Sequence, residues 1–249
     1  MPRQRGKGLD RFKHVETALF LFLACSTGLA GCSTGMENET IEPDDPIQGS
    51  PIQGSPIQRR ILAFGDSVTA GNGTSYGGYT YYLEDLLNVE ESPTVVINAG
   101  VSGELTWEGL GRFESTLRKW NHPQTVLLLE GTNDVTDSSG AGPLGSIVGN
   151  LREMIHIARD DHALQVVLGT VLPRRNYGND QESPTTSELV AAIRDLAEEE
   201  DVLLADHYQN FLELEQWEGY FSDAVHPNHL GYQVLADSWY EGALEYLFP

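Results

Sequence analysis

The sequence of 249 residues predicts an α/β domain in which a parallel β-sheet is covered by helices on both faces. Short apolar runs recur along the chain from Arg59 onward, and segments with helical periodicity lie between them. Strands that alternate with helices are the building units of parallel sheets, and their crossover connections are right-handed. In such a sheet the carboxyl ends of the strands lie at one edge, where open α/β sheets bind ligands.

Five apolar runs are predicted to be the strands of this sheet. The first, Ile61–Phe64, is long enough for a fully buried strand and too short for a helix. The predicted strands cover residues 61–64, 94–99, 125–129, 164–171 and 202–205. The predicted helices lie at about residues 78–88, 107–119, 145–160, 186–200 and 228–247. Together they form one domain at residues 59–249.

The segment before this domain has the pattern of a targeting signal followed by a tether. Basic residues at 3–13 precede an apolar stretch at 17–30, which is too short to span a bilayer comfortably and ends in Leu29-Ala30-Gly31-Cys32. This pattern resembles the bacterial lipobox. It predicts a lipoprotein signal peptide at residues 1–31 and a lipid on Cys32, although an ordinary signal peptide or a short membrane anchor fits the same residues.

Residues 32–58 are predicted to be a disordered tether, because a Pro-Ile-Gln-Gly-Ser repeat cannot bury a core. A lipid anchor at Cys32 would hold the domain on the bacterial cell envelope. By analogy with lipoproteins of two-membrane bacteria, the non-acidic Ser33 favours the outer membrane. We therefore expect a lipid-anchored lipoprotein whose membrane contact is made through its N-terminus.

Composition excludes several other classes of function. The formal net charge of −22 argues against nucleic acid as a partner and against electrostatic docking on anionic lipid. Both cysteines, Cys25 and Cys32, precede the domain, and the histidines show no spacing typical of metal ligands. We expect no metal and no cofactor.

The first strand ends in Gly65-Asp66-Ser67, which reads as a strand, a tight turn and the start of a helix. This position makes Ser67 a candidate nucleophile at the ligand-binding edge of the sheet. The alternative is that Asp66 or Ser67 does no more than cap the helix. Asp134, near the end of the third strand, is likewise expected to brace its loop.

Acyl transfer needs a base, a group that orients the base, and donors for the oxyanion. His226 is the candidate general base, and Asp223 lies three residues earlier, where one loop can present both side chains. Candidate oxyanion donors are the backbone N–H groups of Ser67 and Gly100 and the side-chain amide of Asn133, all at strand ends.

One other histidine is a rival for the base. His207 follows Asp206 at the end of the fifth predicted strand, but it lacks the Asp-x-x-His spacing.

These blocks, in this order, resemble the SGNH (GDSL-type) hydrolase family over essentially all of residues 59–249. The forms Asn98–Gly103 and Glu130–Asp134 resemble its esterase, lysophospholipase and thioesterase-like branch. The resemblance implies a flavodoxin-like three-layer α/β/α fold with a five-stranded parallel sheet. It also implies metal-free ester hydrolysis by the residues Ser67, Gly100, Asn133, Asp223 and His226.

We therefore expect a serine esterase that hydrolyses small acyl esters or lysophospholipid-like lipids through an acyl-enzyme. A carbohydrate O-acetylesterase acting on envelope or environmental glycans is one alternative, and a non-catalytic envelope binding module is another. The motifs do not specify the substrate, and they leave the oligomeric state open. Aromatic-rich loops over the sheet edge, such as residues 72–82, are expected to decide the substrate specificity.

Overall fold

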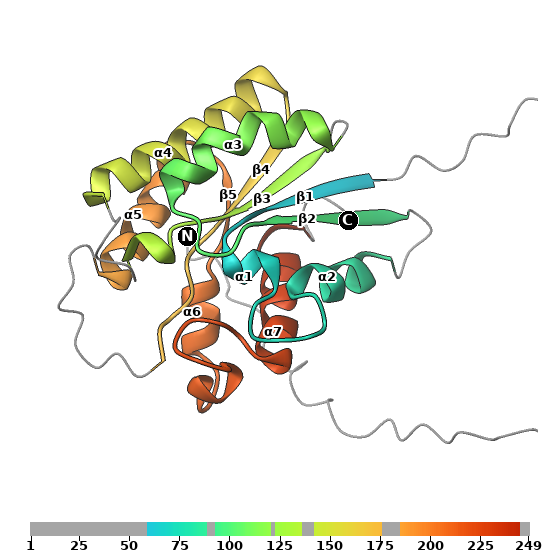
Figure 1. Cartoon of the computed structure of the whole chain (residues 1–249), viewed down its shortest axis with the longest axis vertical. Coiled ribbons are helices and arrows are strands. Elements are labelled where there is room, and N and C mark those ends of the chain that lie inside the picture. Colours follow the sequence, from blue (N-terminus) through green and yellow to red (C-terminus); the bar gives the residue numbers. More distant parts are fainter. Residues whose placement is uncertain (1–58, 89–92, 121–122, 136–141, 176–184, 245–249) are drawn as a thin grey trace, which may run out of the picture. The chain divides into compact units, whose positions relative to one another are not determined.

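The computed structural model describes residues 59–88, 93–120, 123–135, 142–175 and 185–244 (Figure 1). The predicted signal peptide, the lipid on Cys32 and the tether lie outside these residues and stay predictions. Within them, no helix is long and apolar enough to cross a bilayer.

The five predicted strands form one parallel sheet in the order β2-β1-β3-β4-β5. The strands are β1 (Arg59–Gly65), β2 (Thr94–Gly100), β3 (Thr125–Leu129), β4 (Gln165–Gly169) and β5 (Leu203–Ala205). This is the flavodoxin-like order, so the predicted fold class is confirmed. The apolar run of the fourth strand extends beyond β4 because Val171 and Leu172 are buried in the loop that follows it.

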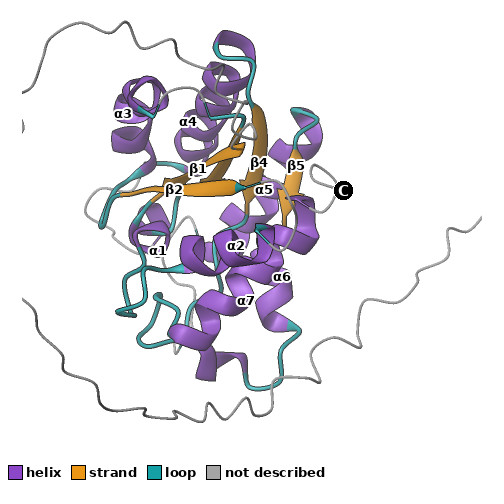
Figure 2. Ribbon diagram, turned by 90° about the vertical axis from the view of Figure 1, so that its right-hand side faces the viewer, coloured by secondary structure: helices purple, strands orange, loops and turns teal. Residues whose placement is uncertain are grey.

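Two helical layers enclose the sheet (Figure 2). The helices are α1 (Ser67–Ala70), α2 (Tyr79–Leu87), α3 (Thr106–Lys119), α4 (Leu144–His156), α5 (Thr186–Glu199), α6 (His207–Leu212) and α7 (His229–Trp239). Helices α3, α4 and α5 share one core with the sheet, and α2, α6 and α7 share the other. Figure 1 shows α3 and α4 on one side of the strands and α2 and α7 on the opposite side.

Strand β1 explains why two cores form. Leu62 and Phe64 point into the core with α3, α4 and α5, whereas Ile61 and Ala63 point into the other core. Side chains alternate between the faces of a strand, and a strand that is buried on both faces needs apolar residues at every position. The continuous apolar run 61–64 follows from this requirement.

The strand order creates the place for a site. From β1 the chain crosses to β2 on one side, and from β2 it crosses to β3 on the other side of β1. The loops after β1 and β3 therefore diverge, and ligands of open α/β sheets bind at such a switch point. The loop after β1 carries Ser67, and the loop after β3 carries Asn133.

Helix α6 and the short 3₁₀ helix Trp217–Tyr220 were not predicted. Both are too short to show a helical period in the sequence. Helix α6 begins where Asp206 caps it by accepting a hydrogen bond from the Gln209 backbone N–H at 3.2 Å.

Candidate active site

The turn after β1 holds Ser67 at the edge of the sheet. Ser67 is the first residue of α1, and the carboxylate of Asp66 caps this helix by accepting a hydrogen bond from the Val68 N–H at 2.8 Å. A side chain at position 65 would overlap both the Thr69 side chain and the Leu129 carbonyl. Only glycine lets the strand turn into the helix at this place.

Ser67, His226 and Asp223 form one hydrogen-bonded chain. The distance from Ser67 Oγ to His226 Nε2 is 2.8 Å, and the distance from His226 Nδ1 to Asp223 Oδ2 is 2.7 Å. The other oxygen of Asp223 accepts hydrogen bonds from the backbone N–H groups of Val225, at 2.9 Å, and His226, at 2.8 Å. The expected proximity of the three side chains is thus present.

The environment of Asp223 favours its ionised form. Partial burial opposes ionisation, but hydrogen bonds from the His226 backbone and imidazole outweigh it, so the pKa of Asp223 lies below its ordinary value. An ionised carboxylate at Nδ1 keeps the proton on that nitrogen and leaves Nε2 to accept the Ser67 proton. The arrangement is therefore suited to general-base activation of a serine.

The loop that presents His226 is held from both sides. Ser222 N–H donates to the His226 carbonyl at 2.9 Å, and the side chain of Asn228 caps α7 two residues further on. Gly73 of the opposite loop packs so closely on this segment that a Cβ there would lie 3.0 Å from the Cβ of His226. These contacts make the position of the imidazole a property of the folded domain.

Asn133 lies in the 3₁₀ turn Asn133–Val135 after β3. Its side-chain amide, which carries two N–H bonds, donates to the Glu104 carbonyl at 2.8 Å. The neighbouring Asp134 is 2% exposed and accepts hydrogen bonds from the Thr106 N–H, at 3.0 Å, and the Thr106 hydroxyl, at 2.7 Å. As expected, Asp134 braces the loop; it does so by joining the loop to the start of α3.

Gly100, which was predicted as an oxyanion donor, already has a partner for its N–H. Its N–H donates to the Asn98 side-chain oxygen at 3.0 Å, which counts against its use as an oxyanion donor. The glycine has another reason to be there, because a Cβ would overlap the backbone of Ala70 in α1. Asn98 is in turn oriented by donating to the Thr69 carbonyl at 2.7 Å.

A second glycine, Gly103, which sequence reasoning passed over, directly precedes Glu104, the residue whose carbonyl accepts the hydrogen bond from Asn133. Gly103 has a φ of 81° in a turn where the Glu104 N–H meets the Val101 carbonyl at 3.3 Å. Its own N–H has no hydrogen-bond partner among the residues that the structure describes. No local signal in the sequence separates it from Gly100, because the contact between the Glu104 carbonyl and Asn133 forms only on folding.

The rival histidine is a core residue. His207 is fully buried, its Nδ1 lies 2.6 Å from the Ser238 hydroxyl, and its ring packs against Trp239 at 4.3 Å between centroids. Burial lowers its pKa to about 3, so the imidazole is neutral. It shares no contact with Ser67 in the described part of the chain.

Within the same described ranges, no group of three or more His, Cys, Asp or Glu side chains is arranged to hold a metal ion. A hydrogen-bonded serine, histidine and aspartate at the switch point of a parallel sheet is the arrangement found in serine hydrolases.

Comparison with known proteins specifies the class further. Residues 63–234 match the GDSL-like lipase/acylhydrolase family, and the chain belongs to this family. It is 31% identical over 180 residues to thioesterase 1/protease 1/lysophospholipase L1 of Escherichia coli, which covers 71% of this chain and 79% of that protein. It is 32% identical to an arylesterase of Vibrio mimicus over 48% of this chain and 58% of that protein.

The fold agrees with a solved structure of the same class. A lipase/acylhydrolase from Enterococcus faecalis superposes with a TM-score of 0.64 and 24% identity, over 74% of this chain and 94% of that chain. The protein is therefore a carboxylic ester hydrolase of the GDSL-like family, and the predicted function class is confirmed.

Proposed function

We propose that Ser67 is the nucleophile of a serine esterase, with His226 as general base and Asp223 as the group that orients it. The observation that carries this proposal is the continuous hydrogen-bonded chain from Ser67 Oγ through the imidazole to Asp223. Both distances lie in the range that proton transfer requires without rearrangement.

In this mechanism His226 Nε2 takes the Ser67 proton while Oγ attacks the ester carbonyl. The C=O π electrons move to oxygen and form a tetrahedral oxyanion. Its collapse expels the alcohol, which receives the proton from His226, and leaves an acyl group on Ser67. Water then repeats the sequence, and the carboxylic acid leaves.

The oxyanion would be stabilised by donors from three segments. Ser67 is the first residue of α1, and the first N–H groups of a helix have no partner within it. The Asn133 amide is the second donor. For the third, the contacts favour Gly103 over Gly100, because the Gly100 N–H is engaged by Asn98.

The proposed substrates are small acyl esters or lysophospholipid-like lipids. Three apolar side chains on segments that carry proposed site residues are exposed and suit an acyl chain: Val101 at 44%, Trp107 at 59% and Leu230 at 50%. The relative from Escherichia coli is named a lysophospholipase and a thioesterase, which favours the same substrates.

The second candidate, a carbohydrate O-acetylesterase, is favoured by the exposed aromatic rings in and after the loop that follows α1. Tyr76 is 60% exposed and packs against His229 at 5.1 Å between ring centroids, and Tyr81 is 57% exposed. Aromatic faces of this kind can stack on sugar rings as well as line an acyl site.

Hydrolysis of p-nitrophenyl esters from acetate to palmitate by the full chain tests both candidates. We expect activity to disappear in Ser67→Ala and to persist in Ser115→Ala, whose serine is exposed on α3. A preference for longer chains supports the lipid substrate, and activity confined to acetate supports the acetylesterase. Undiminished hydrolysis by Ser67→Ala would overturn the assignment of the nucleophile.

We further propose that Cys32 carries a lipid that anchors the enzyme to the bacterial envelope, in the outer membrane. The supporting pattern is Leu29-Ala30-Gly31-Cys32 after an apolar stretch. Labelling with a palmitate analogue in a bacterial host should be lost in Cys32→Ser and retained in Cys25→Ser. Equal labelling of both variants would contradict the proposal.

A further inference from the structure

The carboxyl group of Glu130 is buried without a hydrogen-bond partner among the described residues, three residues before Asn133. Glu130 directly follows β3 and is 1% exposed. Neither of its carboxyl oxygens has a hydrogen-bond donor among the described residues. An ionised carboxylate in such a place has lost its hydration without replacement, which strongly favours the neutral form.

A second buried carboxyl, that of Glu104, lies beside Glu130. Glu104 is 5% exposed and is paired with Arg112, whose Nε donates to Oε1 at 2.5 Å and whose Nη2 donates to Oε2. Both carboxyl groups lie against Gly109 of α3: a Cβ there would be 3.3 Å from Glu130 Oε1 and 3.5 Å from Glu104 Oε2. Arg112 therefore balances the charge of Glu104 and leaves none for Glu130.

Protonation of Glu130 would remove the repulsion between the two carboxyl groups. Two carboxylates only accept hydrogen bonds, so they repel each other, whereas a protonated carboxyl can donate to an ionised one. The pKa of Glu130 is raised well above its ordinary value, first by burial and then by the nearby negative charges of Asp66 and Glu104, against which Arg112 acts only partly. The Glu104 carboxylate is within hydrogen-bonding reach of Glu130 and can accept a hydrogen bond from it once Glu130 is protonated.

The titratable groups Asp66 and Tyr79 near Glu130 supply no positive charge that would stabilise its ionised form. Asp66, after β1, is itself buried, and burial raises its pKa to about 6 despite the hydrogen bond from Val68. Tyr79 of α2 is fully buried, and burial is the main reason that its pKa is raised. Among the described residues, Arg112 is the cation whose charge lowers the pKa of Glu130, and it is already paired with Glu104.

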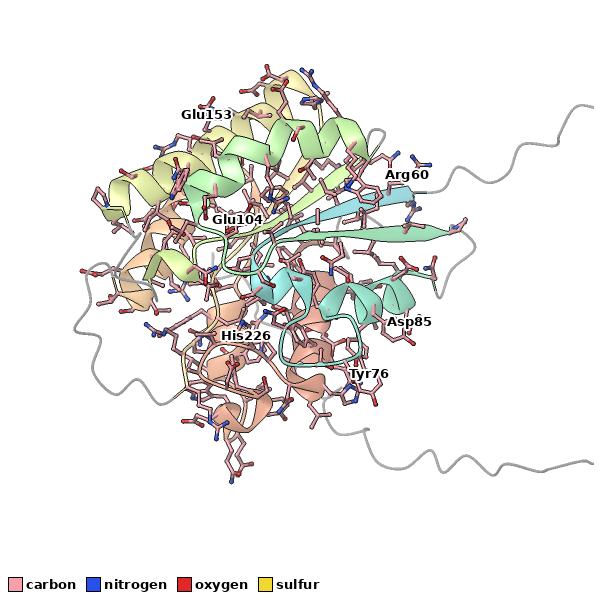
Figure 3. The ribbon with its side chains drawn as sticks, in the orientation of Figure 1. Arg60, Tyr76, Asp85, Glu104, Glu153 and His226 are labelled. Atoms are coloured by element: carbon pink, nitrogen blue, oxygen red, sulfur yellow. The ribbon has the colours of Figure 1, made fainter. Side chains whose placement is uncertain are left out.

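The buried pair is joined to the catalytic parts by direct contacts. The Glu104 carbonyl accepts the hydrogen bond from the Asn133 amide at 2.8 Å, and Glu130 lies three residues before Asn133 in the same loop. Arg112 Nη2 also donates to the Gly65 carbonyl at 3.3 Å, just before the Ser67 turn. Figure 3 labels Glu104 and His226, which lie on either side of α1 in that view.

We propose that Glu130 is a positioning residue that keeps a proton in the working enzyme, donates it in a hydrogen bond to Glu104, and so holds the Glu104 carbonyl that aims the Asn133 amide at the oxyanion. The inference rests on the proposed role of Asn133. Ionisation of Glu130 sets two carboxylates against each other with one arginine between them. Glu104 then shifts, and the Asn133 amide shifts with it.

Infrared spectroscopy of the full chain at neutral pH tests the proton without reference to activity. We expect a C=O band of a protonated, buried carboxyl group that disappears in Glu130→Gln and persists in Glu153→Gln. Glu153 is an exposed glutamate of α4 (Figure 3) and is the matched control. The absence of such a band, or its survival in Glu130→Gln, overturns the proposal even if Ser67 and Asn133 have their proposed roles.

Kinetics test the positioning. Glu130→Ala should lower kcat roughly 10-fold to 10²-fold with little change in KM, because a misplaced donor acts on the transition state. Glu130→Gln should recover most of this loss, since its amide N–H can donate to Glu104. As the pH rises and the infrared band titrates away, the wild-type kcat should fall, whereas that of Glu130→Gln should not.

Two kinetic results would overturn the positioning role: full kcat in Glu130→Ala, or Glu130→Gln as impaired as Glu130→Ala while both remain folded by circular dichroism. Failure of the proposed function gives a different result. In that case Ser67→Ala keeps its activity, or Asn133→Ala keeps its turnover, while the infrared band is unchanged.

Discussion

Replacement of Asn133 by alanine probes the proposed oxyanion hole most directly. The substitution removes the amide and leaves the backbone of the loop anchored, because Asp134 still holds the Thr106 N–H and hydroxyl. It also removes the hydrogen bond to the Glu104 carbonyl. One lost hydrogen bond of this kind lowers the free energy of unfolding by about 1 kcal/mol, which leaves the protein folded.

The expected loss of activity is much larger than the loss of stability. Removal of one oxyanion donor lowers kcat by about 10²–10³, equivalent to about 2.7–4 kcal/mol of transition-state stabilisation. KM should change little, since the donor meets negative charge that develops only as the carbonyl is attacked. Both constants can be measured with p-nitrophenyl butyrate on the full chain.

Asn88→Ala is the matched control. The Asn88 amide donates to the Glu84 and Thr94 carbonyls, each at 2.9 Å, and its oxygen accepts from the Thr94 N–H at 2.7 Å, at the start of β2 and thus at the opposite edge of the sheet. This variant should lose about 1–3 kcal/mol of stability and keep its kcat. A kcat for Asn133→Ala within about threefold of wild type would refute the oxyanion assignment.

Three further predictions concern Asp223, His207 and Glu130. Asp223→Asn should lower kcat about 10³–10⁴-fold, because an amide no longer holds the Nδ1–H tautomer, and kcat measured against pH should show the loss at every pH; a small loss would mean that water replaces the carboxylate. His207 has a pKa of about 3 in the folded state and about 6.5 in the unfolded state, so between these values the unfolded state binds one more proton. The free energy of unfolding therefore falls as the pH drops from 6.5 to 3, by at most about 1.4 kcal/mol per pH unit. Urea unfolding of His207→Gln should show a weaker fall over the same range. For Glu130 the pH dependence of stability has the opposite sign. Its contribution to the free energy of unfolding is complete below the unfolded pKa of 4.5 and declines as the pH rises toward its higher folded pKa. Glu130→Gln should therefore gain stability relative to wild type as the pH rises, and a difference that stays constant with pH would contradict the buried proton.

Local sequence was sufficient for most of the fold. The apolar run Ile61–Phe64 is continuous because β1 is buried on both faces, and this is visible without knowledge of its neighbours. The pair of Asp223 and His226 is also local: one oxygen of the carboxylate accepts the His226 backbone N–H, so the Asp-x-x-His spacing itself builds the contact. Such features depend on residues that are close in the chain.

Local sequence was not sufficient to choose between the two candidate glycine donors of the oxyanion hole. Gly100 and Gly103 stand in one short segment, and both are glycines at a strand end. The Gly100 N–H is engaged because Asn98 is held by the Thr69 carbonyl, a residue distant in the chain. Helix α6 was not predicted for a related reason. It has only six residues, and it is stabilised by its cap and by the packing of Phe211 in the core, which the sequence pattern does not show.

The sequence by itself indicated the sheet, the class of chemistry and the candidate serine, histidine and aspartate, because each follows from local composition and spacing. Only the tertiary structure decided which groups meet and which are free to act. Ser67 and His226 are 159 residues apart in the chain, and the proton of Glu130 depends on Glu104 and Arg112 from another segment. The physical reason is that burial and charge balance at one point in space are sums over segments that the chain brings together only on folding.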